Sequence, residues 1–336
     1  MNGNLKWSTY LLSNSYRCYE EMNRLGKNRI PFLFILDFEC KEPVLIPLDC
    51  VDETGIMYDM EGHTNGKSER IAAKGDFFFR KEPVAYDVYL KAFGKVMEHL
   101  LKGNSYLVNL TFPTRIFTSL TLKDLFLISS SRFRLFVPGK MAVFSPEVFI
   151  RIRNGRIYSY PMKGTADASD PLLAEDLLSG HKERAEHYTI VDLIRNDLSQ
   201  IADDIKIERF AYREFITTHE KMLIQVSSEI SGRLPANYHE HLGDILNALL
   251  PAGSITGAPK TKTLDIIREA ETYERGYYTG VFGIYDGSGL DSAVMIRFIE
   301  QTDGGLIFKS GGGINAYSDP LIEYKELIDK VYVPIA

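Results

Sequence analysis

The sequence predicts a single α+β domain, and three observations support this fold class. The chain has 336 residues, of which 45% are hydrophobic and 25% charged, the balance of a globular protein with a sizeable core. Strand-like segments occur in long groups, and helical segments are scattered among them without regular strand–helix alternation. The sequence contains no internal repeat, low-complexity tract or obvious linker, so we expect one domain over residues 1–336.

The first 80 residues are expected to be rich in β structure. Residues 30–38 (IPFLFILDF) and 44–49 (VLIPLD) predict two strands joined by a turn at 41–43. Asn65 followed by Gly66 is a strong turn signal further along.

The next segment predicts an amphipathic helix over residues 84–102. Its apolar residues recur near helical spacing and Gly103 closes it; they are Val88, Phe93, Val96, Met97 and Leu100. Residues 105–117 return to strand alternation and 121–130 favour a helix. Residues 133–165 predict several strands with a turn at Asn154–Gly155.

The second half contains the clearest helical pattern, at residues 181–202. Its apolar stripe consists of Ile190, Val191, Ile194, Leu198 and Ile201. Strands are expected at 205–210, 221–234, 280–286, 292–300 and 305–313, and helices at 241–250, 261–272 and 320–332.

Composition excludes several classes of protein. The net charge of −6 argues against a general nucleic-acid binder, which is usually basic. No segment has the roughly 18 apolar residues of a membrane span, and the apolar part of the N-terminus is too short for a signal peptide. The three cysteines, Cys18, Cys40 and Cys50, form no CxxC motif and are interpreted as core residues in a reducing cytoplasm.

Two glycine-rich segments are candidate anion sites. Residues 251–260 (PAGSITGAPK) precede a helix, whose N-terminus offers free N–H groups, but they do not match the phosphate-binding P-loop pattern. Residues 310–314 (SGGGI) would let a ligand approach the backbone closely. Taken alone, the first segment could instead be a tight strand-to-helix connection, and the second a glycine bulge or turn.

Charged residues supply further candidates. Glu183 and Glu186 share one helix face, and Glu323 and Glu326 repeat that spacing, so the four could form an oxygen site for Mg²⁺ or simply two solvated faces. Lys163 in PMKGT could be a surface charge or a buried nucleophile. The segment 239–241 (HEH) lacks a zinc-type partner cluster and is interpreted as a solvated helix start.

Taken together, these motifs resemble the chorismate-utilising enzymes, the superfamily of anthranilate, isochorismate, salicylate and aminodeoxychorismate synthases. The resemblance covers residues 85–336 and rests on SYLVNL, SPEVFI, PMKGT, KERAEHYTIVDLIRND, GSITGAPK, MIRFIE, SGGGI and EYKE, in the family's order. It implies two large antiparallel sheets packed as a sandwich with outer helices. Residues 1–84 would be a shortened N-terminal β-rich part, which makes a bound tryptophan doubtful.

Within that superfamily, Lys163 indicates the aminodeoxychorismate synthase branch, because anthranilate synthases carry alanine there and isochorismate synthases also lack the lysine. The resemblance implies that Lys163 attacks C2 of chorismate while Glu147 protonates the leaving C4 hydroxyl. Ammonia would then add at C4 and expel the lysine. The product would serve para-aminobenzoate and folate synthesis.

The resemblance also implies the ligands of this site. Mg²⁺ would be held mainly by Glu186 and Glu326, with Glu183 and Glu323 in or near its coordination sphere. Arg297 would bind a substrate carboxylate. The remaining substrate-binding residues would be Thr256, Gly257, Gly283, Gly311, Gly312, Gly313 and Gln225. The ammonia would come from a separate glutamine amidotransferase subunit, because the sequence shows no glutaminase signature.

Two departures from the family pattern leave alternatives open. Gln225 stands where the family has a histidine near the leaving group, and the sequence after PMKGT lacks the family's arginine. A different reaction on chorismate, such as anthranilate or isochorismate formation, is one alternative. A non-catalytic chorismate-binding subunit is another.

Overall fold

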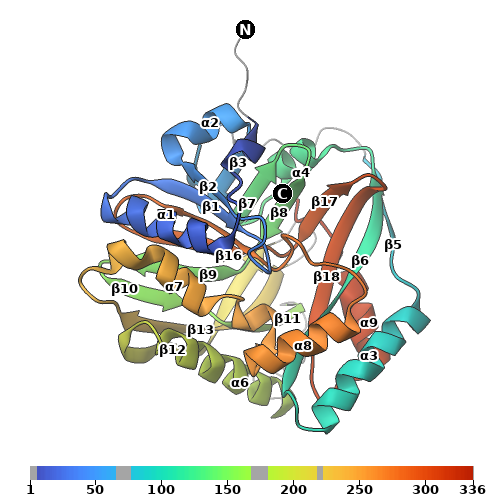
Figure 1. Cartoon of the computed structure of the whole chain (residues 1–336). Coiled ribbons are helices and arrows are strands. Elements are labelled where there is room, and N and C mark those ends of the chain that lie inside the picture. Colours follow the sequence, from blue (N-terminus) through green and yellow to red (C-terminus); the bar gives the residue numbers. More distant parts are fainter. Residues whose placement is uncertain (1–5, 66–76, 168–180, 218–221, 336) are drawn as a thin grey trace.

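The computed structural model describes residues 6–65, 77–167, 181–217 and 222–335. Within these ranges it leaves out the side chains of 163–167, 181–186, 215–217 and 222–223. Among the described residues, all strand pairs are antiparallel and assemble into two sheets of nine strands each, which Figure 1 shows beside one another.

The first sheet follows the order β11-β13-β10-β9-β16-β15-β1-β2, with β12 on β13. Its strands are β1 (Phe32–Leu36), β2 (Val44–Pro47), β9 (Val148–Arg153), β10 (Arg156–Ser159), β11 (Met162–Asp167), β12 (Asp203–Thr217), β13 (Met222–Arg233), β15 (Val281–Tyr285) and β16 (Leu290–Val294).

The second sheet follows the order β14-β6-β18-β17-β8-β7-β3-β4, with β5 on β6. Its strands are β3 (Met57–Met60), β4 (His63–Thr64), β5 (Phe79–Glu82), β6 (Leu107–Thr118), β7 (Phe133–Val137), β8 (Met141–Ser145), β14 (Gly257–Ala258), β17 (Phe298–Thr302) and β18 (Gly305–Ile314). The first 84 residues therefore contribute strands to both sheets.

Helices cover the outer faces of the two sheets (Figure 1). The α-helices are α1 (Ser15–Lys27), α2 (Val51–Thr54), α3 (Tyr86–Leu101), α4 (Leu122–Ile128), α6 (His181–Leu198), α7 (Leu242–Leu249), α8 (Lys260–Ala270) and α9 (Pro320–Asp329). Short 3-10 turns lie at η1 (Trp7–Tyr10), η2 (Leu48–Cys50), η3 (Tyr238–His241) and η4 (Gly253–Ile255).

Strand β1 shows how the core is divided. All five of its residues are buried, because both faces of this strand are covered. Phe32 and Phe34 pack in the apolar cluster beneath α1 and α7, whereas Leu33 and Ile35 belong to the cluster between the two sheets. The sandwich with outer helices that the family resemblance implied is confirmed.

Two details differ from the sequence predictions, and a third agrees with them. Helix α1 was not predicted; its buried stripe includes Cys18, Met22 and Leu25, and Asn14 caps its start. The β3–β4 hairpin turns at Glu61–Gly62, both with positive φ, while Gly66 lies outside the described residues. Asn154 and Gly155 do form the predicted turn between β9 and β10, again with positive φ.

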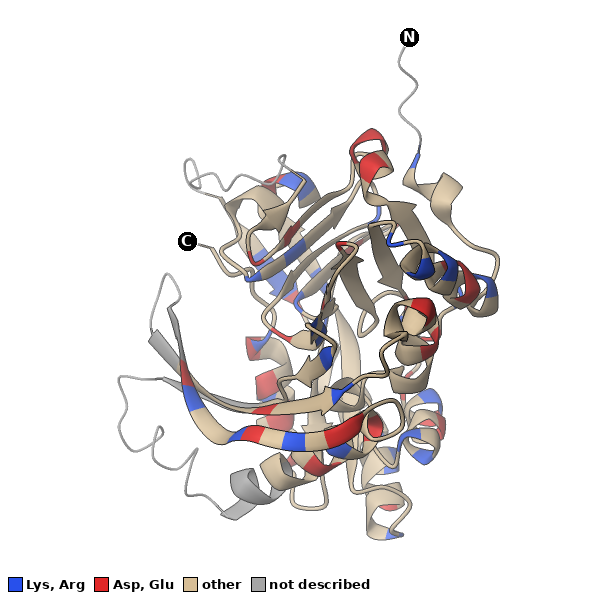
Figure 2. Ribbon diagram, turned by 90° about the vertical axis from the view of Figure 1, so that its left-hand side faces the viewer, with Lys and Arg blue, Asp and Glu red and all other residues tan. Residues whose placement is uncertain are grey.

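Strand β12 is an exposed edge of the first sheet. It carries charged residues of both signs, which Figure 2 shows along its length, and its pairing with β13 is interrupted by register shifts. Charges and bulges on an edge strand oppose pairing with another chain, so β12 is suited to remain an edge.

His239 also differs from its prediction. The helix start at 239–241 is present, but His239 is buried, with its Nδ1 2.6 Å from the Tyr285 hydroxyl, and burial lowers its pKa to about 4. The unfolded chain, with a histidine pKa near 6.5, binds more protons between pH 6.5 and pH 4, so stability falls as the pH falls through that range.

We therefore expect the wild-type protein to lose about 2 kcal/mol of unfolding free energy from this group between pH 7.5 and pH 5. His239→Gln should remove that loss, measured by urea unfolding at both pH values. His241→Gln is the matched control, because His241 is exposed and pairs with Asp244 at the surface. An equal loss in wild type and His239→Gln would contradict the assignment.

Candidate active site

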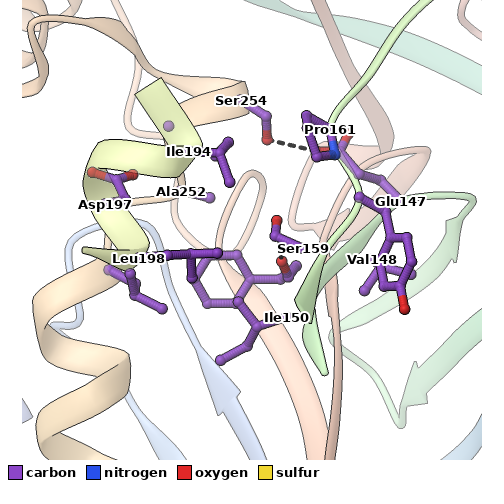
Figure 3. A pocket seen from close by; sticks show the side chains of 14 residues that line it. Glu147, Val148, Ile150, Ser159, Pro161, Ile194, Asp197, Leu198, Ala252 and Ser254 are labelled. Atoms are coloured by element: carbon purple, nitrogen blue, oxygen red, sulfur yellow. Dashed lines mark hydrogen bonds between the residues drawn. The ribbon is translucent and has the colours of Figure 1, made fainter. Parts of the chain in front are cut away.

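Glu147 lies where the chain crosses from one sheet to the other, between β8 and β9. Its side chain is 8% exposed, and its Oε1 accepts a hydrogen bond of 2.5 Å from Ser254 Oγ, drawn in Figure 3. Its backbone is fixed as well, because Val294 N donates to its carbonyl. A buried carboxyl held in one orientation is suited to transfer a proton to a bound ligand.

A small pocket lies beside this carboxyl. Its cavity volume is about 20 Å³, room for roughly one water molecule. Asp197 reaches it from α6 and forms a 2.6 Å ion pair with Lys260; burial raises the pKa of Asp197, which the lysine opposes. The other lining residues are largely apolar and include Val148, Phe149, Ile150, Ile194, Leu198, Leu249 and Ala252 (Figure 3).

The loop that carries Ser254 is tightly held. Thr256 is fully buried, its Oγ1 donates to Ala252 O, and its own carbonyl accepts from Asn109 N. Gly257 has φ +130°, and a Cβ there would lie 1.8 Å from Leu107 O. Both the backbone conformation and the close approach therefore require glycine at this position.

We expect Gly257→Ala to destabilise the protein by more than about 3 kcal/mol, because strain and a backbone clash combine. Gly305→Ala is the matched control: Gly305 has φ +106°, but a Cβ there meets nothing within 4 Å. Gly305→Ala therefore measures the backbone strain without a clash, and we expect it to lower the free energy of unfolding by about 1–3 kcal/mol. Calorimetric melting of the two variants distinguishes these contributions, and equal losses would show that the clash is relieved.

The glycine segment of β18 has one edge free of its neighbouring strand. The pairing of β17 with β18 ends at Phe298 and Lys309, before Gly311. Opposite Gly311 and Gly313 in β6 lie Thr111 and Asn109, whose N–H groups donate instead to Glu271 and to Thr256 O. Antiparallel ladders alternate, so the N–H groups of Gly311 and Gly313 face away from β6.

Helix α9 packs over a face of this glycine segment and carries two carboxylates. Glu323 is buried and accepts from Ser318 Oγ at 2.7 Å, and Glu326 pairs with Lys330 at 2.5 Å. A Cβ on Gly312 would lie 3.6–3.7 Å from Oε2 of Glu323, Oε1 of Glu326 and Nζ of Lys330. Lys330 Nζ also donates to Gly311 O at 3.0 Å.

Arg297 lies where the chain returns to the second sheet. It has φ +53°, and its guanidinium lies 5.1 Å from the Tyr332 ring centroid. Its buried Nε has no hydrogen-bond partner among the described residues. A guanidinium with an unused donor is suited to bind a carboxylate.

These elements match a known family. Residues 58–336 match the family model described as chorismate binding enzyme. The chain belongs to the family of chorismate binding enzymes.

Its relatives agree with this membership. An uncharacterized PabA-like protein of Pasteurella multocida is 47% identical over 316 residues, covering 94% of this chain and 98% of the relative. Aminodeoxychorismate synthase component 1 of Klebsiella aerogenes is 36% identical over 259 residues, covering 72% of this chain and 56% of that protein. This chain thus spans little more than half of the latter.

A solved structure shows the same fold. The menaquinone-specific isochorismate synthase MenF of Escherichia coli superposes with a TM-score of 0.69 at 15% identity, covering 95% of this chain and 82% of that one. At this identity the likeness shows the fold alone. No helix in the described part of this chorismate binding enzyme is long and apolar enough to cross a membrane.

Several predicted site residues of this chorismate binding enzyme come together. Ser254 links Glu147 to the loop that carries Thr256 and Gly257, and β6 pairs with both that loop and the glycine strand. Glu323 and Glu326 face Gly312. The N–H of Gly312 points toward β6, so this residue contributes space rather than a donor.

Other predicted site residues lie in another part of the fold, or their side chains are outside the described residues. Lys163 pairs with Val226 through its backbone on β11, next to a register shift, and its side chain lies outside the described residues, as do those of Glu183 and Glu186 on α6. Gly283 packs inside the first sheet, where a Cβ would lie 2.4 Å from Asp291 O. Its role as a substrate contact stays a prediction.

Gln225 is buried on β13, where it forms a small polar cluster with Ser227 and Glu214. Its Nε2 donates to Ser227 Oγ at 3.2 Å, and Ser227 Oγ donates to Glu214 Oε2 at 2.6 Å. A glutamine can hold neighbours in place, but it cannot transfer protons as histidine does.

The sequence reasoning missed Ser254, Lys330 and the pair Glu271–Arg275. Ser254 stands inside a motif that was recognised, and Lys330 follows Glu326 by one helical turn, which was an available signal. Glu271 and Arg275 have the same four-residue spacing, but the sequence did not show that their partners would be Thr111, Asn109 and Ile255, which they meet only in the folded chain.

Proposed function

We propose that this chain is the component of an aminodeoxychorismate synthase that converts chorismate and ammonia to 4-amino-4-deoxychorismate. The observation that carries the proposal is Lys163 in the PMKGT strand, where anthranilate and isochorismate synthases have no lysine. Two features of the chain support it: the buried, fixed carboxyl of Glu147 and the similarity to aminodeoxychorismate synthase component 1.

The proposed reaction has two substitutions. The amine of Lys163 forms a bond to C2 of chorismate while the C4 hydroxyl leaves, and Glu147 supplies the proton that makes it water. Ammonia then bonds to C4, the bond between C2 and the lysine breaks, and the amine of Lys163 is restored. One difficult substitution is thereby divided into two easier ones.

The same proposal assigns the substrate's carboxylates. Arg297 binds one of them, and the N–H groups of Gly311 and Gly313, with the loop at Thr256 and Gly257, face the other anionic groups. In this geometry the charges of a dicarboxylate meet donors that are already ordered, so little reorganisation is needed on binding.

We also propose that Mg²⁺ is held by Glu323 and Glu326 together with Glu183 and Glu186. The described part of the site fits a hard cation, since the carboxylates of Glu323 and Glu326, three residues apart on α9, both border the space left by Gly312. Among the described residues there is no group of three potential metal ligands, and the side chains of Glu183 and Glu186 lie outside those residues. The ion would neutralise charge on the ring carboxylate.

The ammonia source is proposed to be a separate glutamine amidotransferase subunit. The sequence shows no glutaminase signature, and free ammonium should replace the subunit in vitro. We further propose that the protein acts in the cytoplasm.

The decisive experiment incubates the purified protein with chorismate, Mg²⁺ and ammonium at mildly alkaline pH. Liquid chromatography with mass detection identifies the product, and added aminodeoxychorismate lyase should convert it to para-aminobenzoate. Anthranilate or isochorismate would overturn the branch assignment. Untouched chorismate, even with an amidotransferase present, would favour a non-catalytic binding subunit.

Removal of metal gives a separate prediction. A chelator should lower turnover by at least about 100-fold, and Mg²⁺ should restore it. Mg²⁺ should also raise the melting temperature of the wild-type protein but not of Glu323→Gln, a readout that does not need turnover. Full activity after exhaustive chelation would exclude the metal.

A further inference from the structure

A buried ion pair lies behind both halves of the candidate anion site. Glu271 is the C-cap residue of helix α8, and Arg275 follows four residues later, beyond the helix; each side chain is 2% exposed. Arg275 binds Glu271 with two donors, NH2 at 2.6 Å and Nε at 2.8 Å. Such a fork has one preferred geometry, which a flexible lysine would not reproduce.

The arginine side of the pair reaches the loop of residues 253–257. Arg275 NH1 donates to Ile255 O at 3.1 Å, and NH2 donates to Asn109 O at 2.7 Å. Asn109 in turn donates from Nδ2 to Ile255 O and from its backbone N to Thr256 O, both at 2.9 Å. These hydrogen bonds hold the loop at Ile255 and Thr256, between Gly257 and Ser254, which binds Glu147.

The glutamate side of the pair reaches the glycine strand through β6. Glu271 Oε1 accepts from both the backbone N and the Oγ1 of Thr111, at 2.9 and 2.8 Å. Thr111 lies opposite Gly311, and Asn109 lies opposite Gly313. Both halves of the anion site therefore meet β6 at residues bonded directly to this ion pair.

We infer that Glu271 and Arg275 are positioning residues that set the spacing between the 253–257 loop and the glycine strand. They hold the backbone donors in place without touching the ligand. The inference rests on the proposed function in one respect: it takes these two segments as the binding site of a chorismate carboxylate. An interior ion pair is weak evidence for stability as such, whereas it can fix one geometry.

The protein offers a matched control in the pair Arg134–Asp59. These side chains are 1% and 8% exposed, lie 2.5 Å apart, and the arginine likewise donates to backbone carbonyls, those of Phe126 and Ser129. Those contacts belong to β3, β7 and α4. Arg134→Lys should therefore cost stability without altering the anion site.

The test compares Arg275→Lys with Arg134→Lys in the full chain. Both should lower the melting temperature. Arg275→Lys should also weaken chorismate binding at least tenfold by titration calorimetry without ammonium, and should speed amide hydrogen exchange at least tenfold in residues 253–258 and 310–314. Arg134→Lys should change neither, and wild-type binding and exchange in a folded Arg275→Lys would overturn the inference.

A second variant keeps the test decisive if Arg275→Lys does not fold. Glu271→Gln preserves the shape of the side chain and an acceptor for Thr111, but removes the charge that orients Arg275. The same two readouts apply to it, with the same expected directions. Because neither readout requires a particular product, failure of the amination reaction would leave this test intact and would appear separately in the product analysis.

Discussion

Lys163→Ala is expected to abolish formation of 4-amino-4-deoxychorismate, with a loss of turnover on the order of 10³-fold or more. Without the amine, C2 has no internal nucleophile, and ammonia must displace the C4 hydroxyl in a single step. Chorismate binding should change by less than about tenfold, because the proposed carboxylate contacts come from other residues. Initial rates by mass-detected chromatography and binding by calorimetry separate the two effects.

The control for this change is Lys206→Ala, which removes an exposed lysine paired with Asp204 on β12. It should retain wild-type rates. Acid quenching of wild-type enzyme during turnover should also leave a chorismate-derived adduct on the peptide that contains Lys163. Retention of full activity by Lys163→Ala would falsify the covalent role and return the reaction to direct addition of ammonia.

Glu147→Gln is expected to lower turnover by about 10²–10⁴-fold, the usual contribution of a general acid. Glutamine matches the shape of glutamate and can still accept the hydrogen bond from Ser254, so the local fold should persist. What it lacks is a transferable proton for the leaving hydroxyl. The melting temperature should therefore stay close to that of wild type while the rate falls.

Glu300→Gln serves as the comparison for that variant. Glu300 forms a 2.7 Å ion pair with the buried Lys309 on neighbouring strands of the second sheet. Its loss should cost stability and leave the rate within about twofold of wild type. If the two variants lose activity equally, Glu147 acts through structure and another group protonates the leaving hydroxyl.

Much of the secondary structure could be predicted from residue patterns. The spacing of Phe93, Val96 and Leu100 identifies α3, and the Asn154–Gly155 turn was located because only a few residue types favour positive φ. The two-sheet sandwich came from family resemblance, since β1 is apolar on both faces and its pattern does not show which sheet covers which face. Helix α1 escaped prediction because most of its residues are polar, although its buried residues recur at helical spacing.

Sequence motifs could indicate single residues of the candidate site, but not the contacts between them. Motifs locate single residues such as Glu147, Arg297 and the glycines, because each carries its own chemical signature. The contacts between them depend on folding: Ser254 meets Glu147 across 107 positions of sequence, and Thr111 meets Glu271 across 160. No local pattern records such distances, so the contacts that join the Glu271–Arg275 pair to the loop and to β6 became visible only in three dimensions.

The free edge of β18 has a consequence for solubility. An uncovered strand edge invites pairing with the edge of another molecule and leads to aggregation. Here α9 packs over the glycine segment, with Ser310 Oγ donating to Leu327 O, and Lys330 Nζ occupies the edge carbonyl of Gly311. Helix α9, which carries Glu323 and Glu326, therefore also limits pairing of this strand edge with another molecule. Variants that loosen the packing of α9 should form oligomers before the rest of the domain unfolds.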